Sequence, residues 1–481
     1  MPTELIPFGN QQASGWESLG GAQPLAMNVF TDGAGCVRRR PGIQTYASGP
    51  SSSIDAGGVV GLHSTIGGRL FGVGATADSS SGRLARPIFA LGPGSALNVG
   101  YLPGDKRSVF AETELLGVFA GGQEMIKVEL DTLTGSDLDA SAPLAHHVIP
   151  NSLRLLADDY TSSASLVRFS EIASGNTDYS GNLEWTIGGT DAGAFSAEAR
   201  NDPVVALAEN TNEVFVFGAQ TLQIFAPDTT FVFTPVAARE FGCSAAYSVV
   251  KMDQQFAWLD DKRRFVMSDG RSAEVVSDPI QATLDGIEDV SDCFGYRVLD
   301  GALDALVWTF PTDERTFVFQ KGVGWGQWAG YSAGWTRFPV AAHVLRGDTD
   351  ENVVGTTDGT IAELSLDADD DLGTPINAYS SSGFLDRKTS RLKLCKRVRV
   401  TIQRGETVGG TSPVAWLRSR DKPGAWEQSY PIQLGASGDR EVMVDFYALG
   451  TYRSREWQFE FSGSEALRLV RVEEEYEELN T

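Results

Sequence analysis

Short apolar runs separated by polar turns recur through the first 365 residues of the chain. A typical copy holds two such runs, as in "LLGVFAGGQEMIKVEL" from Leu115 and "VFVFGAQTLQIFAPD" from Val214. Apolar runs of this length, bounded by Gly, Asn and Asp residues, are typical of antiparallel strands joined by tight turns. A helical period of apolar residues is rare, and we expect one short helix, within residues 278–290. The chain is therefore predicted to be an all-β protein.

The copies repeat at a period that indicates a β-propeller. Neighbouring copies start 42 to 50 residues apart, and propeller blades of four short strands repeat every ~40–50 residues. One such sheet cannot bury its faces alone, so blades stack around an axis. We predict six or seven blades, with two or three β-sandwich domains as the alternative. The copies are anchored at Leu70, Leu116, Leu166, Val214, Phe256, Leu306 and Val353, and the copy around Leu166 is the weakest.

The pattern changes near residue 380. Residues 367–383 combine an acidic run with Gly, Pro and Ser residues, which indicates a linker. From Arg387 onward, apolar and polar residues alternate in strands of five to seven residues, with Arg and Glu on the outward face. This alternation predicts a separate C-terminal antiparallel β-sandwich. We expect a hairpin and closure segment at 1–56, a propeller at 57–380 and the sandwich at 381–481.

The segment "VFTDGAGCVRRRPGI", residues 29–43, has the pattern of a β-hairpin. Asp32-Gly33 is a turn sequence that suits a positive φ, and Pro41 ends the strand pairing because it has no N–H to donate. The segment is also a candidate to complete the last blade and so close the ring. Its three consecutive arginines are candidate docking side chains for a partner protein, or they solvate a hairpin edge. These candidates are Arg38, Arg39 and Arg40.

The overall charge argues against a DNA-gripping surface. The chain has 481 residues, of which 63 are acidic and 39 are basic, and its net charge is −24. Proteins that grip duplex DNA gain affinity by neutralising phosphates, which an acidic surface cannot do. The four cysteines stand far apart in the sequence and predict buried free thiols in a reducing compartment. We expect neither a signal peptide nor a membrane span, and folding in a cytoplasm.

A cluster of tryptophans is the most suggestive ligand-binding pattern. "GVGWGQWAGYSAGW" places Trp325, Trp328 and Trp335 among glycines. Aromatic rings in such a setting can stack on sugars or on single-stranded bases. The same pattern suits the outer strand and turn of a blade, with the indoles packed between neighbouring blades. We treat the three tryptophans as weak candidates for a ligand platform.

The remaining motifs do not add up to a catalytic or metal site. His146-His147 has no carboxylate or cysteine at ligand spacing. "DADDDLG", residues 367–373, lacks the glycine and the bidentate glutamate of a calcium loop, so we expect a solvated acidic loop. The glutamate-rich terminus, residues 471–479, reads as a solvated edge or tail, or as an acidic docking tail. We expect no catalytic residue, no cofactor and no metal, although paired carboxylates for glycoside hydrolysis stay possible.

Several blocks resemble one family of phage proteins. The pattern N-x-F, then G, then V-R-R-x-P-G-I over residues 28–43 is similar to the start of packaged-DNA stabilisation proteins, the tail accessory or head-completion factors of short-tailed phages. Residues 212–228 and 239–270 resemble a blade signature and the region that follows it in that family. Residues 314–328 resemble its strand followed by a tryptophan-bearing turn.

The resemblance implies a structural, non-enzymatic protein of the virion tail. It implies a hexameric hub below the portal and adaptor rings that plugs the head, stabilises packaged DNA and lines the ejection channel. It also implies attachment of a tail needle, spikes or fibres. An acidic channel would let duplex DNA slide without specific binding, and Arg38–Arg40 would dock on an acidic ring neighbour. The alternatives are a receptor-binding fibre protein, and a lectin or propeller enzyme that uses the tryptophan cluster.

Overall fold

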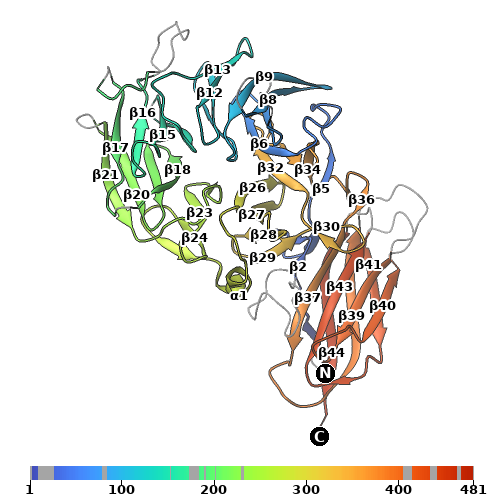
Figure 1. Cartoon of the computed structure of the whole chain (residues 1–481). Coiled ribbons are helices and arrows are strands. Elements are labelled where there is room, and N and C mark those ends of the chain that lie inside the picture. The colour runs from blue at the N-terminus through green and yellow to red at the C-terminus, as the bar shows by residue number, and fades with distance from the viewer. Residues whose placement is uncertain are drawn as a thin grey trace. The chain divides into compact units, whose positions relative to one another are not determined.

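The computed structural model is almost entirely β (Figure 1) and divides into two compact units. Unit 1 comprises residues 1–44, 298–338 and 364–481, and unit 2 comprises residues 45–297 and 339–363. The structure describes residues 3–8, 26–77, 84–151, 153–172, 184–188, 191–200, 202–228, 232–404, 414–433, 441–462 and 467–479.

Unit 2 is a β-propeller built from six antiparallel sheets that follow one another around a ring (Figure 1). Five of the sheets have four strands in sequence order. The first two are β6 (Val59–Ser64), β7 (Leu70–Gly74), β8 (Ala85–Gly92) and β9 (Ser95–Pro103), then β10 (Val109–Glu112), β11 (Leu116–Ala120), β12 (Ile126–Glu129) and β13 (Gly135–Asp137). The third is β14 (Val148–Asn151), β15 (Arg154–Asp158), β16 (Leu166–Phe169) and β17 (Gly193–Ser196).

The other sheets of unit 2 follow the same order. The fourth is β18 (Val204–Asn210), β19 (Glu213–Gly218), β20 (Leu222–Asp228) and β21 (Val232–Arg239), and the fifth is β22 (Val250–Met252), β23 (Gln255–Leu259), β24 (Phe265–Ser268) and β25 (Ala273–Val275). The sixth contains β32 (Val340–Leu345), β33 (Asn352–Thr356) and β34 (Ile361–Ser365). A short helix, α1 (Gln281–Asp285), follows a 3₁₀ turn at Asp278–Ile280, which confirms the short helix expected there.

The predicted period marks the second strand of nearly every sheet. The anchors fall on β7, β11, β19, β23 and β33 of unit 2, and on β27 (Leu303–Phe310) of unit 1. These strands lie in the middle of their sheets and are the most apolar, because both of their faces pack against neighbouring sheets. The anchor at Leu166 instead falls on the third strand, β16. The second strand of that blade, β15, begins with Arg154 and ends with Asp158, so its apolar run is bounded by charged residues.

Unit 1 is organised around two large sheets. In one, the strand order is β3 (Val29–Thr31), β4 (Val37–Arg39), β44 (Leu467–Glu478), β38 (Lys393–Arg404) and β41 (Glu441–Tyr447). In addition, β1 (Thr3–Leu5) pairs with β44, and β42 (Thr451–Tyr452) pairs with β38. The other runs through β27, β28 (Arg315–Gln320), β29 (Gly324–Trp328), β2 (Ala26–Met27), β37 (Asn377–Leu385), β43 (Arg455–Ser462), β39 (Val414–Arg420) and β40 (Gln428–Gln433), with β26 (Phe294–Asp300) preceding β27.

Buried side chains from both sheets of unit 1 form one hydrophobic cluster. Trp457 and Phe459 of β43 lie in it together with Val398 and Val400 of β38, and all four are at most 1% exposed. Burying side chains of this size contributes roughly 1.5–3 kcal/mol each to folding. This shared core is why apolar and polar residues alternate along these strands.

Part of the predicted linker is a buried strand. β37 pairs along most of its length with β43, and Ser380, Ser381 and Ser382 are at most 2% exposed. Ser382 Oγ accepts a hydrogen bond from Trp457 N at 3.0 Å, and Ser381 Oγ bonds the side chain of Gln458 at 3.2 Å. Serine is usually exposed, so the run predicts a solvated segment, yet the hydroxyls of Ser381 and Ser382 have protein partners in place of water.

The acidic C-terminus is a central strand rather than an edge or a tail. β44 lies between β4 and β38, and its glutamates face arginines and lysines of the basic strand β38. Lys396 Nζ lies 2.5 Å from Glu477 Oε2, and Arg397 Nη2 lies 3.2 Å from Glu475 Oε2. Opposite charges directly across two strands stabilise the pairing, so the two charged runs neutralise each other on one sheet.

The propeller core predicts a large difference between two tryptophan substitutions. Trp258 of β23 is fully buried, packs on Phe217 and donates its indole N–H to Gly242 O at 2.9 Å. Trp258→Ala should therefore lower the free energy of unfolding by roughly 3–5 kcal/mol. Trp335→Ala, at a side chain that is 39% exposed, should cost about 1 kcal/mol or less. Equal shifts of the two unfolding midpoints in urea would contradict this assignment of the core.

Candidate functional site

The N-terminal hairpin forms as predicted, but its turn works differently. β3 and β4 pair antiparallel with Val29 opposite Arg39. The residue with positive φ is Gly35, at 81°, rather than Gly33. Asp32 shapes the turn with its side chain, because its Oδ1 accepts hydrogen bonds from the backbone N–H groups of residues 34 and 36, each at 3.0 Å. This aspartate caps the turn as Asx residues commonly do.

Arg40 is the most enclosed of the three consecutive arginines. Its side chain is 0% exposed, and both of its Nη atoms donate to the carboxylate of Asp371, at 2.9 and 2.5 Å. Nε donates to Asn28 Oδ1 at 3.0 Å, and the Nη atoms also donate to the carbonyl oxygens of Pro41 and Ala329. A guanidinium matched by a two-point carboxylate and by backbone acceptors is a fully satisfied buried cation.

The neighbouring residues complete the same contact with the acidic loop. Arg39 Nη2 donates to Asp369 Oδ1 at 2.7 Å, and burial lowers the pKa of Arg39. Gly42 is required here, because a Cβ at this position would lie 2.6 Å from the carbonyl oxygen of Ala368. Two of the three arginines therefore bind this chain's own aspartates. Arg38 is partly exposed, with its guanidinium 5.7 Å from the Phe30 ring centroid.

These contacts bear on one of the two readings of the arginines. Solvation of a hairpin edge is wrong for Arg39 and Arg40, which are 6% and 1% exposed. The acidic loop is likewise not a freely solvated one, since Asp369 and Asp371 are ion-paired. Docking on a partner stays a prediction, and Arg38 is the arginine that has exposed surface to serve it.

The tryptophan cluster divides into two buried rings and one exposed ring. Trp325 and Trp328 on β29 are 6% and 0% exposed, and Trp328 packs edge-on against Phe338. Trp335 lies on the two-residue strand β31 (Trp335–Thr336), which pairs with β30 (Gly330–Tyr331). It is 39% exposed and its ring lies 5.3 Å from that of Tyr331. Only Trp335 of the three can face a ligand.

The first strands of the propeller sheets surround a cavity of about 460 Å³ in unit 2. The sequence reasoning missed it, although the same strand of every repeat faces the axis of a propeller. Three of the four histidines of the chain line it, together with Arg107, Lys251, Glu209 and the rings of Tyr247, Phe294 and Tyr296. A largely preformed cavity with a few converging polar groups is the usual place for a ligand in a propeller.

The cavity histidines are held neutral by burial. Burial, with the nearby charge of Arg107, lowers the pKa of His63 to about 3, and its Nε2 shares a hydrogen bond of 2.9 Å with Ser108 Oγ. Burial lowers the pKa of His343 to about 4, although its hydrogen bond to Asn352 acts in the opposite direction. The guanidinium of Arg107 lies 3.8 Å from the Phe294 ring centroid. The lining of the cavity therefore combines uncharged imidazoles with the guanidinium cation of Arg107.

The carboxylate chemistry of the cavity is limited. Glu209 is the acidic residue in the described lining, and Lys251 Nζ donates to its backbone oxygen at 3.1 Å. The pKa of Glu209 is raised, because the effect of burial exceeds the opposite effect of the nearby Lys251. Glycoside hydrolysis by the usual route needs two carboxyl groups that flank the bond, which this described lining does not provide. Among the described residues, no group of three or more His, Cys, Asp or Glu side chains is placed to hold a metal ion.

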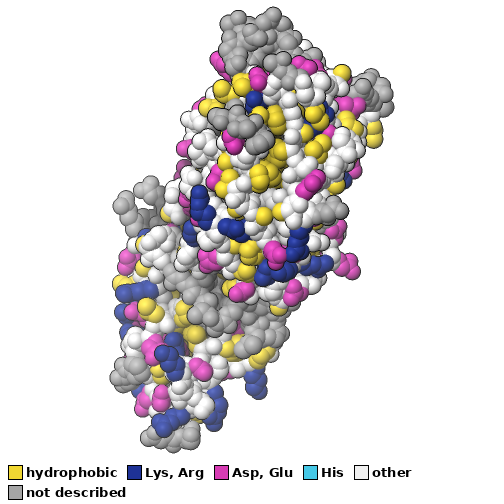
Figure 2. Space-filling view, turned by 90° about the vertical axis from the view of Figure 1, so that its left-hand side faces the viewer, with side chains coloured by type: hydrophobic (Ala, Val, Ile, Leu, Met, Phe, Trp, Pro, Cys, Tyr) yellow, Lys and Arg dark blue, Asp and Glu magenta, His cyan; other side chains and the backbone are white. Residues whose placement is uncertain are grey.

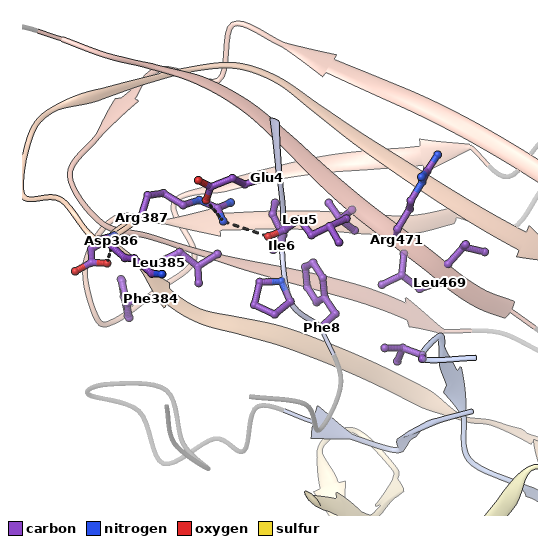
Figure 3. A pocket seen from close by; sticks show the side chains of 16 residues that line it. Glu4, Leu5, Ile6, Phe8, Phe384, Leu385, Asp386, Arg387, Leu469 and Arg471 are labelled. Carbon is purple, nitrogen blue, oxygen red and sulfur yellow. Dashed lines mark hydrogen bonds and ion pairs between the residues drawn. The ribbon is translucent and has the colours of Figure 1, made fainter. Parts of the chain in front are cut away.

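Two further hollows lie on the units. In unit 1, a groove of about 720 Å³ runs beside β1, β44 and the turn after β37, where Arg387 bonds Glu4 and the backbone of Leu5 (Figure 3). On the outer edge of unit 2, Phe195, Phe233 and Val236 line a groove of about 490 Å³ between β17 and β21. Hydrophobic side chains gather on this side of the propeller (Figure 2).

One comparison with known families finds a match. Residues 187–377 match the sequence model of a family described as "Bacteriophage P22 Gp10, beta-propeller". The resemblance to the phage packaged-DNA stabilisation family is confirmed. The match covers part of the propeller and strands β27–β29. It contains three of the four blocks that carried the resemblance, residues 212–228, 239–270 and 314–328. It supports a structural protein of a phage virion.

Other comparisons concern the fold. The crystal structure of BamB from Moraxella catarrhalis aligns over 63% of this chain and 93% of its own length, with 9% identity and a TM-score of 0.37. The N-terminal domain of Nup159 aligns over 72% of this chain and 99% of its own length, with 9% identity and a TM-score of 0.40. At these scores neither structure bears on the function of this chain. No curated protein matches the sequence, and no described helix is long and apolar enough to cross a membrane.

The buried arginine predicts non-additive effects on stability. Arg40→Met leaves the Asp371 carboxylate without its partner, and Asp371→Leu leaves Arg40 without its counter-ion. Each change should lower the free energy of unfolding by roughly 3–5 kcal/mol, because an unpaired buried charge is costly. Arg40→Met combined with Asp371→Leu should cost clearly less than the sum of the single changes. Arg38→Met is the matched control and should stay within about 0.5 kcal/mol. Additive losses in urea unfolding would contradict the pairing.

The cavity histidines predict a loss of stability in mild acid. Their folded pKa values, about 3 for His63 and about 4 for His343, lie below the unfolded value of about 6.5. Their contribution is therefore fully present above about pH 6.5 and falls by up to about 1.4 kcal/mol per histidine per pH unit below it. Most carboxylates titrate only below about pH 5, so the effect of these two histidines is measured between pH 7 and 5 by comparison with a variant that lacks them.

The control is the variant His63→Gln with His343→Gln, which keeps polar side chains but cannot titrate in this range. Its thermal midpoint should change less between pH 7 and 5 than that of the native chain. An identical acid slope in the two proteins would show that these histidines are not held neutral.

Proposed function

We propose that the chain is a structural, non-enzymatic component of the tail of a short-tailed phage. In this proposal it forms a hexameric ring below the portal and adaptor, retains packaged DNA and lines the path by which the DNA leaves. The observation that carries the proposal is the match of residues 187–377 to the phage β-propeller family.

The charge of the chain fits a channel component. A net charge of −24 opposes non-specific adhesion to DNA phosphates, so a duplex that passes the ring would meet repulsion rather than many weak bonds. The same charge favours partners with basic surfaces, since complementary potentials speed association and exclude wrong partners. Both effects suit a ring that must bind protein firmly and DNA not at all.

A carbohydrate- or receptor-binding tail protein is the second candidate, and one observation favours it. Trp335 and Tyr331 form an exposed aromatic pair, at 39% and 40% exposure. Such a pair can stack on a sugar ring. If this surface binds host glycans, Trp335→Ala should abolish binding to a glycan array. The change leaves the buried Trp328 in place and should keep the fold. We expect the native chain to bind no glycan in this assay.

Sedimentation velocity of the full-length chain, alone and with the portal–adaptor complex of its phage, tests the ring. We expect the chain to co-sediment with that complex in hexameric stoichiometry, because the ring would assemble on a preformed symmetric partner. A chain that sediments as a monomer in both runs would contradict the proposal. If the chain sediments as a trimer and does not bind the portal–adaptor complex, the result would favour the receptor-binding alternative.

A further inference from the structure

The turns between the first and second strands of the propeller sheets share one face of unit 2. The sheets succeed one another around a ring, so their first strands run in the same direction along the axis and end on the same side. A hydrogen bond of 2.7 Å from Ile66 N, in the β6–β7 turn, to Glu112 Oε2, at the end of β10, ties two of these ends together. The composition of these turns can therefore be compared blade by blade.

Three consecutive turns each present an exposed aliphatic side chain on this face. Ile66 in the β6–β7 turn is 82% exposed, Leu115 in the β10–β11 turn is 41% exposed, and Leu153 in the β14–β15 turn is 69% exposed. We call these three residues the apolar crest. Turns at a protein surface are usually polar, since an exposed aliphatic group gains nothing from folding.

The backbone of Leu153 makes the choice of residue still less expected. Its φ is 63°, in the left-handed region that L side chains other than Asn and Asp rarely adopt. The corresponding turns of other blades in unit 2 also contain a residue with positive φ, and these are Thr211, Asp253 and Asp350. Those residues are polar, as a solvated turn requires. Neither turn geometry nor solubility favours a leucine at position 153, whereas contact with another molecule would.

The charges around the crest indicate the chemistry of its partner. Three carboxylates stand at this end of the second sheet: Glu112 and Glu114 in or beside the β10–β11 turn, and Asp131 in the β12–β13 turn. One cation, Arg69 of the β6–β7 turn, lies among them and donates a hydrogen bond to the backbone oxygen of Leu130. An apolar surface bordered by carboxylates fits a protein surface that is apolar and bordered by lysine or arginine. It fits a membrane poorly, because anionic lipid head groups repel carboxylates. Contact between two crests is also disfavoured, since the carboxylates around both would repel each other.

We propose that Ile66, Leu115 and Leu153 form the contact by which the propeller docks onto another protein of the virion, whose docking surface is apolar and flanked by basic residues. This inference rests on the proposed function, because it requires that the chain be part of the particle. It adds a defined surface and the chemistry of its partner.

Site-specific photo-crosslinking in assembled phage particles tests the crest. A photoreactive amino acid replaces Ile66 or Leu153 in the full-length chain, and purified particles are irradiated and digested for mass spectrometry. Two positions serve as matched controls: Thr211 in the equivalent turn of a later blade, and Val236, which is apolar and 56% exposed but lies on the outer strand β21. Both crest positions should link to the same virion protein, at a peptide that contains apolar and basic residues.

A second measurement asks whether the contact contributes affinity. Leu153→Asp should weaken binding of the chain to the crosslinked partner by about tenfold or more, as expected for an apolar residue that carries part of the contact. Thr211→Asp adds the same charge to an equivalent turn and should leave binding within about twofold. Equal effects of the two changes would overturn the crest as the contact.

The outcomes separate this inference from the proposed function. If the chain is present in particles but the crest positions crosslink no more than the controls, the crest is not a docking surface and the proposed function stands. Crosslinks to another copy of this chain, to lipid or to an acidic peptide would overturn the partner chemistry. If the chain is absent from particles, the proposed function itself fails.

Discussion

A small β-sheet has two faces to bury, and this constraint determines most of the propeller. Each blade of unit 2 meets it by packing both faces on neighbouring sheets, so its middle strands are almost wholly apolar, as in β19 and β23. The first strands then face a common axis, where His63 and His343 line a cavity and are kept neutral by their surroundings. The turns between the strands of a blade do not pack against neighbouring sheets. An exposed apolar residue in such a turn therefore indicates contact with another molecule.

Unit 1 shows how a strongly acidic chain places its charges. The basic strand β38 lies beside the acidic strand β44, and Arg40 is enclosed with Asp371. In both arrangements, basic side chains pair with carboxylates of the same chain. The surplus of 24 negative charges is therefore left for surfaces that face solvent, partners or DNA. This division is consistent with a protein that repels phosphate while its own sheets hold together.

The sequence predicted what depends on local pattern and missed what depends on distant pairing. The spacing from Leu70 to Val353 located nearly every middle strand, because apolar runs record burial directly. The run Ser380–Ser382 was read as linker because its hydroxyls find their partners 75 or more residues away. Arg40 and Asp371 are separated by 331 positions, and no spacing rule connects them. The position of the cavity could be predicted, since the first strand of each blade faces the axis. Its histidine-rich lining could not.

The central claim is that this propeller protein is built into the tail of a phage particle. A cryo-electron microscopy reconstruction of the tail of the purified particle tests it most directly. The account predicts density for the six-bladed unit in a rotationally symmetric ring around the DNA path, with the face of Ile66, Leu115 and Leu153 against another virion protein. A reconstruction in which the chain is missing from the tail, or occurs only in a peripheral fibre, would contradict it.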